Sequence, residues 1–147
     1  MTVGYLLDLL TINEVRKEKM GDDLDSDVSH DLSRQNGFYL REIGKYLIEI
    51  ADGERPGVFA KHKNYDKGIS EPFSGNLIDI LYKLYQRHSE LWDLEDVRRD
   101  KDNSGEVRLE AADKVSVANK KRNDLVEQVD REITNYLKNT KIRRWKK

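Results

Sequence analysis

Four polar residues that could do chemistry lie along helical faces that are otherwise apolar. His88 and Glu95 occur in the stretch HSELWDLEDVRRD, and Asn119 and Arg122 occur in a later helical segment. An imidazole or a carboxylate can act as a general base or bind a metal ion, and a guanidinium can hold an anion. Because an unpaired buried charge is strongly destabilising, we expect these side chains to contact one another or a ligand.

The predicted helix over residues 76–100 shows why these positions should face inward. Two apolar stripes with steps of three and four residues run along it, and Leu81, His88 and Glu95 belong to both. These three side chains are therefore predicted to point most directly into the core.

The helix predicted to follow, over residues 106–139, carries Arg122 at the equivalent position, where two stripes meet. If it forms a hairpin with 76–100 around the turn DKDNSG, His88 lies level with Asn119 and Arg122. Two interpretations of this polar layer stay open: a structural network that fixes the register of the helices, or a ligand or catalytic site. The candidates for catalysis are His88, Glu95, Asp96 and Arg99, and those for ligand binding are Trp92, Asn119, Arg122 and Asp130.

A series of mostly polar residues in this half of the chain also carries a family resemblance. In order, they are Trp92, Leu94-Glu95-Asp96, Arg99, Asp113, Asn119, Arg122, Asp124, Glu127 and Asp130. The pattern resembles domain-of-unknown-function family 4254, a group of uncharacterised bacterial helical proteins, over about residues 77–134. The resemblance implies that the polar layer is part of the family pattern, and it brings no known activity.

The stretch DKDNSGEVRLEA, residues 100–111, is similar to the start of a calcium-binding EF-hand loop. Asp100, Asp102 and Ser104 match the first three ligand positions, but Ala111 stands where a bidentate glutamate is required. The same residues are also typical of an ordinary turn.

Two pairs of acidic residues resemble the motifs that hold magnesium in all-helical nucleotide pyrophosphohydrolases. They are Glu90 with Asp93 and Glu127 with Asp130. Such pairs are common on the solvated faces of acidic helices. A divalent metal ion, Mg²⁺ or Ca²⁺, is therefore the one cofactor that the sequence suggests.

The composition indicates long amphipathic helices in a single domain, residues 1–147. Charged residues make up 37% of the chain, the formal net charge is −1, and there is no cysteine. Disulfides, thiolate nucleophiles and zinc sites that need sulfur are excluded. The small net charge offers no global field to attract nucleic acid or anionic membrane. No apolar run reaches the ~20 residues needed to span a membrane, so no membrane-spanning helix is expected. The absence of cysteine fits a reducing cytoplasm, and a cytoplasmic location is expected.

Helical periodicity predicts an all-α fold, a four-helix bundle built from two related helical hairpins. The hairpins are predicted to be related because GYLLDLL at 4–10 recurs as GNLIDIL at 75–81. The long connection over residues 53–75 joins them and is either functional or mobile. The predicted helices span about residues 3–20, 26–52, 76–100 and 106–139.

These observations favour a binding or scaffold module, or an oligomeric one, with a buried polar layer. The alternative is a small-molecule or metal-dependent phosphate-processing enzyme with a His/Glu/Arg site inside the bundle, so enzymatic activity stays open. Self-association is expected because helices of this length extend beyond a small four-helix core. The basic C-terminal tail, 140–147, ends in KIRRWKK. Its charges suit the dipole at a helix C-terminus, so we do not expect residues 141–147 to bind nucleic acid or an anionic surface.

Overall fold

The computed structural model describes residues 1–56 and 76–139, and within these ranges the chain is helical, with no β-strand. The predicted all-α fold is confirmed, and each predicted helix end lies within one residue of the observed one. Most of the predicted 53–75 connection and the 140–147 tail lie outside the described residues. The elements are α1 (Val3–Met20), the short 3-10 helix η1 (Gly21–Asp23), α2 (Ser26–Ala51), α4 (Leu77–Arg99) and α5 (Gly105–Asn139).

The first hairpin begins and ends its helices with local capping residues. The Thr2 side chain accepts a hydrogen bond from the backbone N–H of Tyr5 at 3.2 Å, which starts α1. Gly21 ends that helix with a φ of +50°, a conformation that residues with a side chain rarely adopt. Asp25 then caps α2 by accepting a hydrogen bond from the N–H of Val28 at 2.8 Å. Short-range chemistry therefore sets these boundaries.

The second hairpin uses the same chemistry. Asn76 and Asp79 form a reciprocal capping box at the start of α4, each side chain accepting from the other's backbone N–H. At the start of α5, the Ser104 hydroxyl accepts a hydrogen bond from the N–H of Val107 at 3.2 Å. These N-caps determine where α4 and α5 begin. The two helices carry most of the polar layer.

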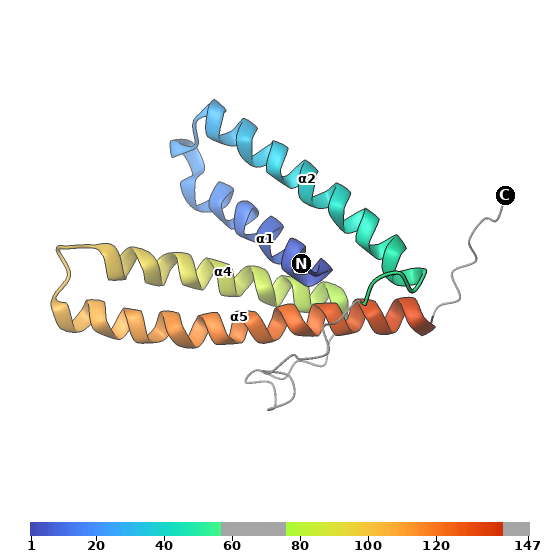
Figure 1. The fold of residues 1–147 in the computed structure, drawn as a ribbon. Helices are drawn as coiled ribbons and strands as arrows, with labels where there is room; N and C mark the ends of the chain where they lie inside the picture. The colour runs from blue at the N-terminus through green and yellow to red at the C-terminus, as the bar shows by residue number, and fades with distance from the viewer. Residues whose placement is uncertain (57–75, 140–147) are drawn as a thin grey trace.

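The four α-helices of residues 1–56 and 76–139 form two antiparallel hairpins that are tilted relative to each other (Figure 1). α4 and α5 pair along most of their length, and α1 packs against both of them. α2 packs against α1 and, near its C-terminal end, against α5, whereas among the described residues its backbone does not come close to that of α4. α1 is therefore the helix that joins the two hairpins.

The apolar core lies where α1 meets the α4–α5 pair, and α2 closes it at one end. Leu6, Leu84 and Leu125 come from three different helices, and each is fully shielded from solvent. Burying side chains of this size contributes about 1.5–3 kcal/mol each to folding. The other buried members of the core are Val3, Ile43, Ile50, Ile80, Val129 and Ile133.

The buried face of α4 differs from the predicted one. Leu81, His88 and Glu95 were expected to point most directly inward, but the buried residues of α4 are Ile80, Leu84 and His88. The prediction considered only α5 as the neighbour of this helix. Because α1 also packs on α4, the most buried direction points between its two neighbours, and only His88 keeps its predicted burial.

No helix among the described residues is both long enough and apolar enough to cross a membrane.

Candidate functional site

A buried hydrogen bond between an imidazole and a carboxyl group joins the middle of α4 to α1. Nε2 of His88 lies 2.6 Å from Oδ1 of Asp8, and these residues are only 6% and 3% exposed. Each of these two residues occupies a position on a packed helix face where an apolar side chain would be expected. The contact is therefore a specific feature of the interface between the two hairpins, because a buried carboxylate needs a partner.

Arg122 of α5 completes a three-residue cluster around this carboxylate. Its Nη1 lies 4.0 Å from the second oxygen of Asp8, Oδ2, at the outer limit of an ion pair. Nη2 donates to the side chain of Asn123 at 3.1 Å, while Nε is buried and has no hydrogen-bond partner among the described residues. A buried guanidinium N–H without a partner is unusual and leaves a donor that a ligand can satisfy.

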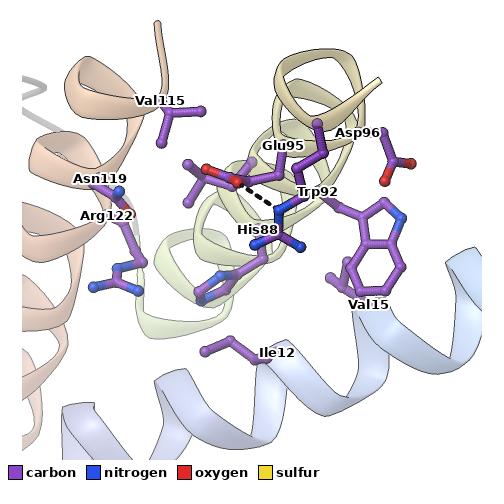
Figure 2. A pocket seen from close by; sticks show the side chains of 11 residues that line it. Ile12, Val15, His88, Trp92, Glu95, Asp96, Val115, Asn119 and Arg122 are labelled. Carbon is purple, nitrogen blue, oxygen red and sulfur yellow. Dashed lines mark ion pairs between the residues drawn. The ribbon is translucent and has the colours of Figure 1, made fainter. Parts of the chain in front are cut away.

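His88 and Arg122 line a pocket with a volume of about 330 Å³, between α1, α4 and α5 (Figure 2). Asp8 is not among the lining residues, so it lies behind the imidazole and the guanidinium and supports both. The lining residues are Ile12, Val15, His88, Leu91, Trp92, Glu95, Asp96, Arg99, Val115, Asn119 and Arg122.

The two sides of the pocket differ in chemistry. Arg122 and Asn119 come from α5 on one side, and Trp92 projects from α4 over Val15 of α1 on the other (Figure 2). The indole and Ile12 offer apolar surface, and Asp96 lies beside the indole (Figure 2). A pocket that combines apolar surface with a few polar groups is typical of a small-molecule site, and its volume is at the small end of the usual range.

The predicted site residues are therefore largely brought together. His88, Trp92, Glu95, Asp96 and Arg99 of α4 line the same pocket as Asn119 and Arg122 of α5. The register predicted for this hairpin, with His88 level with Asn119 and Arg122, agrees with this arrangement.

Glu95 does not join the buried cluster, contrary to the expected network. Its Oε2 accepts hydrogen bonds from Nε of Arg98 at 3.0 Å and from Nη2 at 2.5 Å, and it lies 3.3 Å from Nε of Arg99. The hydrogen bond to Glu95 raises the pKa of Arg98, and the Coulomb attraction of the carboxylate adds to this effect. Residues three and four positions apart on a helix are neighbours, so Glu95 finds cations on α4 itself. Glu95 therefore lines the pocket but is not the partner of His88.

Asp130 lies away from the pocket, although it was predicted to bind a ligand. It is 1% exposed, and its Oδ1 accepts a hydrogen bond from the backbone N–H of Gly4 at 2.6 Å. A carboxylate at the N-terminus of a helix is favoured by the helix dipole. Asp130 therefore anchors the start of α1 on α5.

The turn that resembles an EF-hand loop has the geometry of an ordinary turn. Oδ1 of Asp100 accepts a hydrogen bond from the N–H of Asp102 at 2.9 Å, and Ser104 is engaged in capping α5. Within the described ranges, no three His, Asp or Glu side chains are grouped closely enough to hold a metal ion.

The first of the two acidic pairs predicted as magnesium ligands is engaged with cationic side chains. Glu90 lies 2.6 Å from Arg87, and Asp93 lies 3.0 Å from Lys19. In the second pair, Asp130 holds the start of α1. These contacts account for three of the four carboxylates without a metal ion.

Two polar features were not found from the sequence. Asp8 was not recognised as a site residue, although it shares a stripe at helical spacing with Gly4, Ile12 and Val15. In the first hairpin, Asn13 and Asn36 form a buried amide pair. A search for any polar residue interrupting an apolar stripe would have found Asp8.

Comparison with known families locates the matching region in the second hairpin. Residues 78–146 match the model of the family described as Protein of unknown function (DUF4254). The resemblance predicted from the sequence is thereby confirmed. The pocket residues of α4 and α5 lie within the DUF4254 match, and Asp8, Ile12 and Val15 of α1 lie outside it. No curated protein and no solved structure matches the chain.

Proposed function

We propose that this protein is a binding module for a small molecule that carries an anionic group, held in the pocket between α1, α4 and α5. The observation that carries the proposal is the guanidinium of Arg122, which lines this pocket and whose buried Nε has no hydrogen-bond partner among the described residues. Guanidinium groups bind carboxylate and phosphate groups through paired hydrogen bonds.

The other lining residues support the same class of ligand. Asn119 adds a neutral donor beside Arg122, and Arg99, which is 73% exposed and lies 3.3 Å from Glu95, adds a second cation. Trp92 and Leu91 offer apolar surface to the remainder of the molecule. A small metabolite with a charged head and an apolar or planar body fits this distribution better than a purely polar ion.

An enzyme acting on such an anion is the second candidate, and the Asp8–His88 pair is the observation that favours it. A carboxylate that hydrogen-bonds one nitrogen of an imidazole orients the ring and stabilises its protonated form, as in general-base sites. Conversion of the bound molecule, as opposed to binding alone, separates this candidate from the first.

The test of the binding proposal is a thermal-shift and calorimetric titration of the full chain with sulfate, phosphate, small phosphate esters and carboxylates. We expect at least one anion to stabilise the protein, by about 1.4 kcal/mol when its concentration is ten times Kd. Arg122→Met should abolish the effect, and Asn119→Ala should weaken it while leaving the Asp8 cluster intact.

The matched control is Arg34→Met, because Arg34 lies on α2, is 72% exposed and pairs with nearby Asp31. This variant should bind the anion as the wild type does. Equal stabilisation of the Arg122→Met and Arg34→Met variants, or no stabilisation of the wild type by any of these anions, would contradict the proposal.

A further inference from the structure

Two carboxylates line the pocket, and they differ in whether the protein itself already engages them. Oε2 of Glu95 accepts a hydrogen bond from Nε of Arg98 and lies 3.3 Å from Nε of Arg99, so its negative charge is compensated on α4. The carboxylate of Asp96 is exposed and makes no hydrogen bond or ion pair with the described residues. Asp96 is therefore the pocket carboxylate that a ligand can engage without breaking an existing contact.

The groups that can hold an anion lie on the other side of the pocket from Asp96. Arg122 and Asn119 project from α5, whereas Asp96 lies beside the indole of Trp92 on α4 (Figure 2). Trp92 and Asp96 are four residues apart, so they are neighbours on one face of the helix. The pocket thus presents a guanidinium and an amide on one side, and a carboxylate next to an aromatic ring on the other.

We propose that the ligand of this pocket is a zwitterion, with an anionic group at one end and an ammonium group at the other. The inference rests on the proposed anion-binding function and names the class of molecule that binds there. The anionic group binds Arg122 and Asn119, and the ammonium group lies against Trp92 beside Asp96. Binding is non-covalent, and no bond of the ligand changes.

The Trp92 side of the pocket suits an ammonium group for two reasons. The face of an aromatic ring attracts a cation through its quadrupole, and indole is the strongest of the aromatic side chains in this respect. The neighbouring carboxylate of Asp96 adds a charge-assisted hydrogen bond to the same cation. A purely anionic ligand gains neither contact and is repelled by Asp96. The lining residues therefore favour an alkyl carboxylate that carries an amino group over the same molecule without one.

The placement of these groups on two helices also sets where the charges of the ligand must lie. An α-amino acid carries its ammonium and carboxylate groups on one carbon, so both would have to bind on the same side of the pocket. In an ω-amino acid a methylene chain separates the two groups and can lie against Ile12 and Leu91. We therefore expect ε-aminocaproate to bind more tightly than its α-amino isomer norleucine.

An NMR titration of the isotope-labelled full chain with caproate and with ε-aminocaproate tests the proposal. The two molecules share one carbon chain and differ by an amino group that is protonated at neutral pH. Changes of chemical shift give a Kd even for weak binding. For the wild type we expect the Kd of ε-aminocaproate to be lower than that of caproate by about three- to tenfold, the combined effect of an exposed ion pair and a cation–π contact.

Three variants and a control make the result specific. Asp96→Asn removes the charge at an exposed position without changing the size of the side chain, so ε-aminocaproate should lose most of its advantage over caproate. Trp92→Leu should reduce the same advantage, and Arg122→Met should abolish the binding of both molecules. Asp113→Asn is the matched control, because Asp113 is exposed on α5 and does not line the pocket. This variant should bind both molecules as the wild type does.

The possible failures are distinguishable. Equal Kd values for caproate and ε-aminocaproate, or binding of sulfate without binding of either molecule, would overturn this inference and leave the proposed function standing. An advantage of ε-aminocaproate that persists in both the Asp96→Asn and Trp92→Leu variants, or norleucine binding equally well, would overturn the placement of the ammonium group. The absence of binding by sulfate, caproate and ε-aminocaproate alike, or unchanged binding in the Arg122→Met variant, would overturn the inference together with the anion site.

Discussion

At the scale of single residues, Gly4 shows how closely α1 approaches α5. A Cβ added at Gly4 would lie 2.6 Å from the backbone oxygen of Val126 and 2.9 Å from the carboxyl group of Asp130. The backbone oxygen cannot move aside without moving α5. Glycine at this position therefore permits both the helix contact and the hydrogen bond from its N–H to Asp130.

We expect Gly4→Ala to lower the free energy of unfolding by about 1–3 kcal/mol, the usual cost of forcing extra atoms into a packed site. Gly44→Ala is the matched control, since it also lies inside a helix but an added Cβ would meet nothing within 4 Å. That variant should gain about 0.5–1 kcal/mol from the better helix propensity of alanine. Urea denaturation measures both changes, and equal effects would contradict the close approach.

At the scale of the helices, a buried amide pair joins α1 to α2. Nδ2 of Asn13 donates to Oδ1 of Asn36 at 2.9 Å and to Oε1 of Gln35 at 3.2 Å, and Nδ2 of Asn36 donates to Glu14 at 3.1 Å. Asn13 and Asn36 are 5% and 9% exposed. One interpretation of the polar layer in the second hairpin was that it fixes the register of the helices. In the first hairpin, the Asn13–Asn36 pair favours one register of α1 and α2 in this way.

A double-mutant cycle tests this role. Asn13→Leu or Asn36→Leu alone should cost about 1–3 kcal/mol, because each leaves a buried amide without its partner. The double variant should cost less than the sum of the two, because both polar groups are then removed. The free energies of unfolding of the four proteins give the coupling, and a double variant that costs the full sum would argue against a shared contact.

At the scale of the whole molecule, two hairpins share one core but leave part of α2 uncovered. Leu40 and Ile48 are 58% and 57% exposed and lie four residues on either side of Gly44, so they share one face of the helix. The self-association predicted from the helix lengths stays a prediction, and this apolar face is where we expect a second copy to pack.

We therefore expect the wild type to sediment as a dimer and Ile48→Glu to sediment as a monomer, because the substitution places a charge in the contact. Val117→Glu is the control, since Val117 is 56% exposed but lies on α5. Analytical ultracentrifugation over a range of concentrations makes the measurement. A monomeric wild type at every concentration, or the same change of mass in both variants, would contradict the assignment of this face.

The sequence by itself determined the helices and the level at which the polar residues of the second hairpin meet. Caps such as Asn76 with Asp79 act over three residues, and the period of the apolar stripes is a property of each helix alone. A short turn between α4 and α5 then brings His88 beside Asn119 and Arg122. All of this information is local, so it could be read from the order of the residues.

The tertiary structure decided which of these groups interact and which face of α4 is buried. His88 pairs with Asp8, eighty residues earlier in the chain, and that contact exists only because α1 docks onto α4 and α5. Glu95, equally prominent in the stripes, pairs instead with Arg98 on its own helix. The apolar stripe of a helix indicates which way its side chains point, but not which residues they contact. Those contacts depend on how helices that are far apart in the sequence pack together.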